Sequence, residues 1–290
     1  MSIFKSNLIL LLVAAIWGFA FVAQRTGMEH VGPFTFTGIR FLLGSMTLVP
    51  LIFMDKSDRP LEPAGSNSTL LPGMLAGTVL FIAVSLQQVG IIYTTAGKAA
   101  FITGLYTVLV PVISILLRQS VGKGTWIGCL LAVTGLYFLC IKESFSIGFG
   151  DLLELVGALF WAFHILIIGY FSPKTSAFKL SFAQFLTCGL LGLGVAAFTE
   201  TMAYNRLMAA AVPILYGGIC SVGIAYTLQV VAQKQAHPAH AAIILSLESV
   251  FAAVGGWLIL GEFLSLRAMT GCALMLAGMI ISQLGSSRSS

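Results

Sequence analysis

Charged residues are scarce in this chain. They make up 9% of its 290 residues, whereas soluble globular domains carry about a quarter. With 58% apolar side chains and a mean hydropathy of +1.00, the chain has too few polar residues to cover a water-exposed surface. Its 15 Lys and Arg are scattered singly, without a basic helix or tract, which argues against nucleic-acid binding despite the net charge of +5. We therefore expect an integral membrane protein whose surroundings are the lipid bilayer.

Catalytic and metal-binding motifs are also missing from the sequence. There is no HExxH, no GxSxG, no phosphate-binding glycine loop and no pair of Asp residues within the apolar segments. The five cysteines lie in apolar runs at spacings unlike zinc or redox motifs, so we interpret them as buried thiols. These absences predict a protein without enzymatic activity, cofactor or metal.

The apolar residues that are present form ten segments. A helix needs about 20 residues to cross the hydrocarbon core of a membrane, and each segment is close to that length. The only sizeable connection is a polar stretch over residues 55–69, which leaves no soluble domain. The sequence thus predicts an all-α, polytopic membrane protein with ten transmembrane helices, over residues 7–25, 33–54, 70–92, 98–117, 122–141, 149–170, 179–198, 209–233, 239–260 and 265–284.

The second half of the chain repeats the first. A shift of 144 residues places Trp17 on Trp161 and Arg40 on Gln184, and shifts of 142 to 143 place Lys98 on His240 and Tyr106 on Glu248. We therefore predict two five-helix repeats, residues 1–145 and 146–290. Because five is odd, the second repeat enters the membrane from the opposite side, and the two are related by a pseudo-twofold axis in the membrane plane.

The distribution of basic residues predicts the orientation. Connections on the side of the amino terminus hold nine Lys and Arg, and those on the other side hold five. Since cytoplasmic loops carry the excess of positive charge, both termini are expected in the cytoplasm, with the protein in the plasma (inner) membrane. The nine are Lys5, Lys56, Arg59, Arg118, Lys123, Lys174, Lys179, Lys234 and Arg288.

Glu248 is the principal candidate for function. It lies eight residues beyond His240, about 12 Å along a helix, and so close to the bilayer midplane. An ionised carboxylate at that depth has to be paired, hydrated or protonated. Its repeat partner Tyr106 is expected at the same depth, which gives a carboxylate and a phenol at the midplane. The alternative is a Glu that only fixes helix packing through hydrogen bonds.

Other polar residues inside the segments leave more than one interpretation open. Arg40 could clamp a carboxylate of the substrate, pair with a buried Glu or extend to the lipid headgroups. Lys98 and His240 open equivalent helices on opposite faces and could act as gate residues or as interfacial anchors. His164 could relay a proton or form a neutral hydrogen bond in the bundle.

Aromatic and amide side chains could complete a cavity. Trp17, Trp161, Tyr106, Tyr226, Phe101 and Phe160 are candidates for an aromatic wall, although most aromatic residues must pack or face lipid. Gln184 is a further cavity candidate as the repeat partner of Arg40. Gln87, Gln88 and Gln229 are polar enough at their depth to line a hydrated space.

Three stretches resemble the EamA-like branch of the drug/metabolite transporter superfamily. They are AAIWGFAFVAQR (14–25) with Gly38-Ile39-Arg40-Phe41, AGKAAFITGLYTVLVP (96–111) and LSLESVFAAVGGWLILGEFLS (245–265). The resemblance covers almost the whole chain. It departs from the family pattern at Gln119, where Glu is frequent, and at Ser249, where Pro is frequent.

The resemblance implies a basket-like bundle around a central cavity and transport by alternating access. We expect a secondary transporter that exports small metabolites, amino acids being the favoured class. A nucleotide-sugar or multidrug carrier is the closest rival, and a non-transporting membrane scaffold is a further alternative. The expected partner is a small-molecule solute, and the sequence leaves the oligomeric state open.

Overall fold

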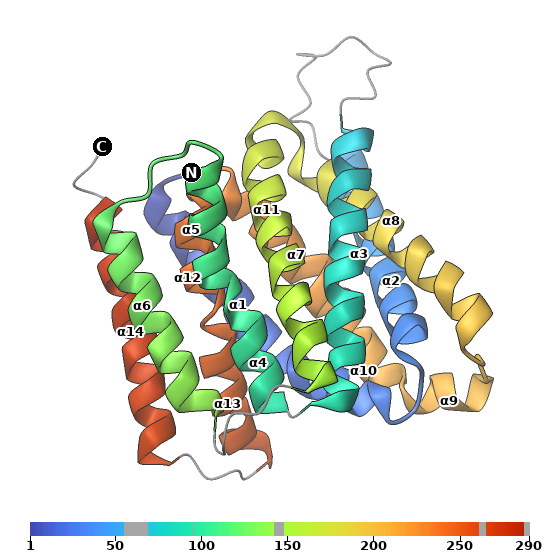
Figure 1. Ribbon diagram of the computed structural model, residues 1–290. Helices are drawn as coiled ribbons and strands as arrows, with labels where there is room; N and C mark the ends of the chain where they lie inside the picture. The colour runs from blue at the N-terminus through green and yellow to red at the C-terminus, as the bar shows by residue number, and fades with distance from the viewer. Residues whose placement is uncertain (55–68, 95, 142–147, 261–264, 287–290) are drawn as a thin grey trace.

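The computed structural model describes residues 1–54, 69–94, 96–141, 148–260 and 265–286. Within these ranges the regular secondary structure is helical (Figure 1). The elements are α1 (Ile3–Met28), α2 (Pro33–Met54), α3 (Leu70–Tyr93), α4 (Ala96–Gly104), α5 (Tyr106–Leu116), α6 (Lys123–Cys140), α7 (Phe149–Phe171), the 3-10 turn η1 (Ser172–Lys174), α8 (Ala177–Thr199), α9 (Tyr204–Ala209), α10 (Ala211–Leu215), the π-helix η2 (Tyr216–Tyr226), α11 (Thr227–Gln233), α12 (Pro238–Leu245), α13 (Glu248–Leu260) and α14 (Leu266–Ser286).

The predicted membrane segments are confirmed. In the described part of the chain, nine helical segments are long and apolar enough to cross a membrane, and α14 adds a shorter apolar helix, Leu266–Ser282. Three of the crossings are composite: α4 with α5, α10 with η2 and α11, and α12 with α13. The start of α1 and the end of α14 lie at the same end of the bundle (Figure 1), as ten crossings require. The protein is thus a multi-pass membrane protein.

The packing of the helices follows the sequence repeat. Two pairs of equivalent helices pack on each other, α2 on α8 and α6 on α14. The other contacts come in matched sets: α1 packs on α13 as α7 packs on α5, and α2 packs on η2 as α8 packs on α3. A twofold relation between the halves produces this pattern, because it places every helix contact on the contact between the two equivalent helices.

Glycines at these self-paired contacts show that equivalent helices run antiparallel. A Cβ at Gly128 of α6 would lie 2.7 Å from the carbonyl oxygen of Gly278 of α14, and one at Gly135 would lie 2.5 Å from that of Gly271. Residues late in α14 therefore meet residues early in α6. Small residues permit this close approach of backbones, which stabilises helix pairs in lipid. The repeats are inverted, as predicted.

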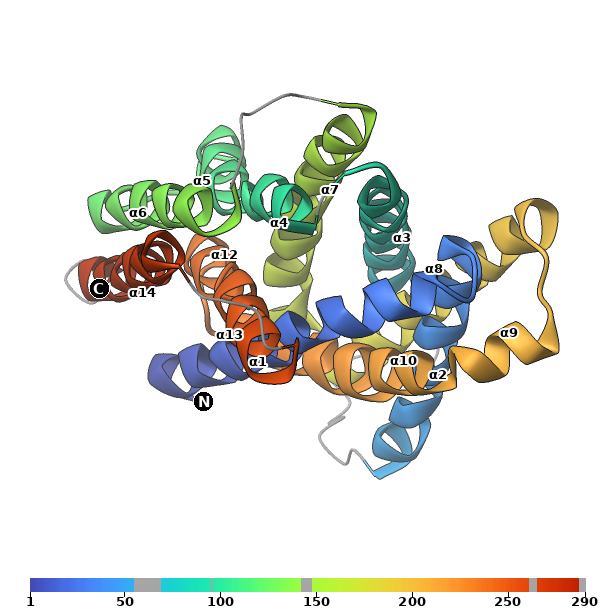
Figure 2. The same ribbon diagram turned by 90° about the horizontal axis from the view of Figure 1, so that it is seen from below.

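The view along the bundle shows two rows of helices (Figure 2). One row holds α4, α7 and α3, and the other holds α13, α1 and α10. The pair α6 and α14 lies at one end of the rows, and the pair α2 and α8 lies at the other. The space between the rows is where residues from both repeats meet.

Two equivalent crossings are interrupted halfway through the bundle, which the sequence pattern does not indicate. The break between α4 and α5 falls at Leu105, and that between α12 and α13 falls at Ser246 and Leu247. Gly104 precedes the first break, and in the second the Ser246 hydroxyl donates to the carbonyl of Ile243 at 2.8 Å. Such a bond from a serine side chain to an earlier carbonyl bends helices. Each second half-helix consequently begins near the midplane, about 15 Å from the start of the first.

Candidate functional site

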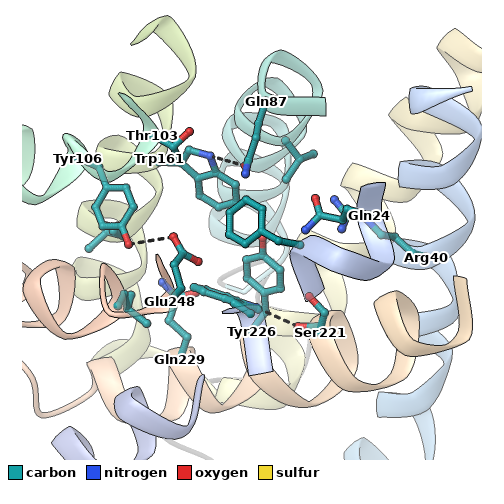
Figure 3. A pocket seen from close by; sticks show the side chains of 15 residues that line it. Gln24, Arg40, Gln87, Thr103, Tyr106, Trp161, Ser221, Tyr226, Gln229 and Glu248 are labelled. Atoms are coloured by element: carbon teal, nitrogen blue, oxygen red, sulfur yellow. Dashed lines mark hydrogen bonds between the residues drawn. The ribbon is translucent and has the colours of Figure 1, made fainter. Parts of the chain in front are cut away.

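A cavity of about 40 Å³ lies between the two rows and is partly open to solvent. Both repeats contribute to its lining, as the close-up shows (Figure 3). Polar groups share the wall with aromatic rings. The lining residues are Trp17, Phe21, Gln24, Arg40, Val84, Gln87, Thr103, Tyr106, Trp161, Ile165, Ser221, Tyr226, Gln229, Leu245 and Glu248.

Glu248 and Tyr106 meet at one side of the cavity. Glu248 is the first residue of α13 and Tyr106 the first of α5, so both stand at the amino-terminal end of a half-helix. The Tyr106 hydroxyl donates to Oε1 of Glu248 at 3.3 Å. Tyr106 is buried, whereas Glu248 is partly exposed to the cavity. Positive helix ends favour negative charge, and interrupted helices form the solute and ion sites of many transporters.

Close packing holds this pair in place. A Cβ at Gly18 of α1 would lie 2.7 Å from the Glu248 carbonyl oxygen and 2.6 Å from Cβ of Phe251. The absence of a side chain at Gly18 thus lets α1 lie directly against the first turn of α13. Trp17, the neighbour of Gly18, reaches the cavity beside Glu248.

Arg40 lies on the other side of the cavity, next to Gln24 (Figure 3). Its side chain is 3% exposed, and its Nε has no hydrogen-bond partner. The guanidinium carbon lies 5.3 Å from the ring centre of Phe36 and 5.2 Å from that of Phe41. Among the described residues no carboxylate neutralises it. Arg40 therefore does not extend to the headgroups, and it does not pair with a buried Glu among the described residues; the sequence had left both alternatives open.

Tyr226 stands between the two charged residues, surrounded by aromatic rings (Figure 3). Its ring centre lies 4.5 Å from that of Trp17 and 6.3 Å from that of Trp161, with the second pair stacked at 13°. The rings of Phe41 and Phe185, which are repeat partners, close the cluster from behind at 5.7 and 6.0 Å. An apolar or aromatic group entering the cavity would therefore contact rings from both repeats.

The two matched tryptophans are fixed by their indole N–H groups. Trp161 donates to Oε1 of Gln87 at 3.1 Å, and Trp17 donates to the carbonyl oxygen of Ser221 at 3.3 Å. Gln87 and Gln229, which the sequence indicated as polar at depth, both line the cavity. Gln88 is buried elsewhere, with no hydrogen-bond partner for its side-chain amide.

The π-helix η2 supplies the wall beside Arg40. Trp17 bonds to its Ser221 carbonyl, and Tyr226 is its last residue. A Cβ at Gly217 would lie 3.4 Å from Cδ of Arg40, so the guanidinium stem lies over a glycine. π-Helical turns are rare and occur mostly at functional sites. Apolar periodicity does not indicate this one.

His164 and Gln184 lie behind the aromatic cluster and outside the cavity lining. Both are fully buried, and Nε2 of His164 lies 2.9 Å from Oε1 of Gln184. The His164 ring also packs edge-on against Trp161 and Tyr226. The pair supports the wall, and neither residue reaches the cavity itself.

Lys98 and His240 occupy equivalent places, each the third residue of its helix, α4 and α12. The Lys98 side chain lies outside the described residues. Nδ1 of His240 lies 2.7 Å from the hydroxyl oxygen of Ser282 on α14. Next to it, outside the membrane segments, burial lowers the pKa of His237, whose Nδ1 accepts the first free N–H of α12 at 3.3 Å.

One carboxyl near the cavity was missed by the sequence reasoning. Glu154 on α7 is fully buried, and its Oε2 accepts a hydrogen bond from Thr103 at 2.8 Å. Thr103 lines the cavity, so Glu154 lies one side chain behind it. The signal was a lone Glu in an apolar run, but its nearness to Asp151 at the start of α7 makes it resemble a helix-capping acid.

Comparison with known proteins assigns this architecture to a family. The model of the EamA-like transporter family matches the chain twice, over residues 4–141 and 148–283. The chain belongs to the EamA-like transporter family. This EamA-like protein is therefore a membrane transporter that handles small-molecule solutes, and the family places it among transporters rather than enzymes.

Relatives of this EamA-like transporter extend over nearly its full length. A protein of Archaeoglobus fulgidus described as an uncharacterized transporter is 32% identical over 277 residues, covering 95% of this chain and 85% of the relative. The uncharacterized transporter YoaV of Bacillus subtilis is 25% identical over 292 residues, covering 95% and 96%. A solved crystal structure superposes with a TM-score of 0.80 at 17% identity over 99% of both chains, which shows a shared fold.

Proposed function

We propose that this EamA-like transporter is a secondary, alternating-access carrier in the plasma (inner) membrane that exports small metabolites, with amino acids and related zwitterions as its solutes. The observation that carries the proposal is the separation of charge in the cavity. Glu248 and Arg40 lie on opposite sides of Tyr226, and no described side chain of opposite charge neutralises either of them (Figure 3). A solute with one positive and one negative group would supply both missing counter-charges.

The inverted repeats support the mechanism. The two units proposed to move are residues 1–145 and 146–290, which would rock about the pseudo-twofold axis. Contacts between equivalent residues lie on that axis, including Tyr106 with Glu248 and Phe41 with Phe185, whose ring centres are 6.1 Å apart. A site on the axis keeps its residues while the bundle opens to one side or the other. The excess of Lys and Arg on the side of the amino terminus supports cytoplasmic termini.

An organic-cation or multidrug carrier is the second candidate. A carboxylate beside Trp17, Trp161 and Tyr226 matches the aromatic surroundings in which proteins bind quaternary ammonium groups. A nucleotide-sugar carrier is less well supported, because the lining holds one basic residue, Arg40, in the described part of the chain. A non-transporting scaffold would not need the cavity.

The test begins with a thermal-shift screen over amino acids, purines, sugars and quaternary amines. Exchange of the hit, radiolabelled, is then measured in proteoliposomes for the wild type and Glu248→Gln. Glutamine keeps the acceptor for Tyr106 but removes the charge, so we expect exchange to be lost together with its pH dependence. Glu29→Gln, at an exposed position at the end of α1, is the matched control. Unchanged exchange with an unchanged pH profile in Glu248→Gln would remove Glu248 from the mechanism.

A further inference from the structure

A second buried carboxyl lies beside the cavity, on α7. Glu154 has no exposed surface, and its Oε1 has no hydrogen-bond partner. Oε1 packs against the backbone of α3, since a Cβ at Gly90 would lie 2.7 Å from it. Neither oxygen is exposed to solvent, and no described basic side chain pairs with either. An ionised carboxylate in this position is strongly disfavoured unless a proton or another cation accompanies it.

The hydrogen-bond donor to Glu154 among the described residues is also a residue of the cavity wall. Thr103 on α4 donates its hydroxyl proton to Oε2 of Glu154, and the same side chain lines the cavity. A hydroxyl has one proton to donate, so an ionised Glu154 holds it away from the cavity. When Glu154 is protonated, its own O–H can donate, and the Thr103 proton becomes available to a solute or water. The protonation of Glu154 thereby determines whether Thr103 can donate a hydrogen bond into the cavity.

The groups around Glu154 also offer a route for the proton. Asp151 lies one turn earlier on α7 and accepts hydrogen bonds from the hydroxyl of Thr94, which follows α3, and from the N–H of Gly148 at 2.8 Å. α7 begins at the end of the bundle opposite the start of α1 (Figure 1). The other titratable residues on the elements that pack against α7 are Tyr93 of α3, Lys98 of α4, whose side chain lies outside the described residues, Tyr106 of α5, His240 of α12 and Lys174 of η1. Asp151 is thus the acid next to Glu154 in the direction of the end of the bundle at which α7 begins.

We infer that Glu154 is a second proton-binding site of the carrier, separate from Glu248, loaded from the side of the membrane on which α7 begins and connected to the solute cavity by Thr103. In each cycle one proton would bind a Glu154 oxygen from that side and later leave to water. If that side is the exterior, each proton moves inward as solute moves outward, and the two movements are coupled. The coupling rests on the proposed function, whereas the proton site does not.

Infrared difference spectra of the purified full-length protein in lipid nanodiscs test the proton site without any solute. As the pH rises from about 5 to about 9, a protonated carboxyl loses its carbonyl band. We expect one such band to be absent in Glu154→Gln, present in Glu248→Gln and Glu29→Gln, and shifted in Thr103→Val, which removes the hydrogen bond. Spectra of Glu154→Gln that superimpose on those of the wild type would overturn the assignment.

A second variant, Glu154→Asp, provides a test if Glu154→Gln does not fold. It keeps a carboxyl but withdraws it from Thr103, and its band must then be shifted relative to the wild type. An unshifted band in Glu154→Asp would contradict the inference.

Transport measurements distinguish a failure of this inference from a failure of the proposed function. With radiolabelled L-leucine and L-tryptophan in proteoliposomes, Glu154→Gln should retain solute exchange, which moves no net proton, and lose accumulation driven by a pH gradient. If Glu154→Gln accumulates solute to the level of the wild type, the proposed coupling is overturned. If the wild type transports no solute of the thermal-shift panel, the proposed function fails, and the infrared spectra still decide whether Glu154 binds a proton.

Discussion

Arg40 is a buried cation that lies between aromatic rings, and no carboxylate in the described part of the chain pairs with it. Its neighbours Phe36 and Phe41 offer their ring faces, which attract a guanidinium by about 0.5–2 kcal/mol and do not replace water as hydrogen-bond acceptors. Leaving a charge partly unsatisfied is costly, which is why we propose that Arg40 receives the anionic group of the solute. Glu248 is the opposite case, a carboxylate with one phenol donor.

Substitution of Arg40 tests which part of the solute it recognises. Arg40→Met should abolish the thermal shift given by an amino acid and leave that given by its amide, since the amide lacks the carboxylate. A lost charged hydrogen bond costs about 1.5–3 kcal/mol, or roughly a 10- to 150-fold weaker affinity. Arg40→Lys is the charge-matched control. Its thermal shift with the amino acid should lie between that of the wild type and that of Arg40→Met. Equal losses for acid and amide would mean that Arg40 only supports the fold, and full binding of quaternary amines in Arg40→Met would favour the cation carrier.

Among the helices, the pair α6 and α14 is distinguished by its distance from the cavity. Neither contributes a lining residue, and they meet through Gly128, Gly135, Gly271 and Gly278, where backbones approach directly. In lipid such contacts stabilise a helix pair through dispersion and close fit rather than through exclusion of water. The pair therefore joins the two repeats at one end while α2 and α8 join them at the other.

A single methyl group tests this contact. In Gly271→Ala the new Cβ would lie 2.6 Å from the Gly135 carbonyl oxygen, so the helices must separate and the thermal unfolding temperature in detergent should fall. Overpacking of this kind typically costs about 1–3 kcal/mol. Gly194→Ala on the exposed face of α8 meets nothing within 4 Å and should raise stability by up to about 1 kcal/mol, since alanine favours helix. A Gly271→Ala protein as stable as Gly194→Ala would refute the close contact.

The whole molecule is organised by inversion, and the distribution of its basic residues predicts its orientation in the membrane. Equivalent helices are antiparallel, and the start of α1 and the end of α14 share one end of the bundle while α9 lies at the other (Figure 1). The nine Lys and Arg on the side of the termini outnumber the five opposite, which favours retention of the termini in the cytoplasm.

Cysteine labelling in intact cells checks that orientation. A membrane-impermeant maleimide should label Asn205→Cys on α9 and should label Ser2→Cys only after the cells are opened. Both positions are exposed, and the native cysteines are partly or fully buried. The unsubstituted protein gives the background. Labelling of Ser2→Cys in intact cells would show that the protein has the opposite orientation, and the direction assigned to proton entry would then be reversed.

The sequence alone determined the ten crossings, the repeat and its inversion, because apolar length and an odd helix count depend only on local composition and counting. It also placed Glu248 and Tyr106 at one depth, since both positions follow from residue spacing along a helix. Tertiary structure decided the rest: which faces turn inward, so that Gln184 and His164 lie behind the wall; where helices break or widen into a π-turn; and that Glu154 touches a cavity residue. These features depend on contacts between residues far apart in the chain, such as Thr103 with Glu154, and spacing along one helix carries no information about them.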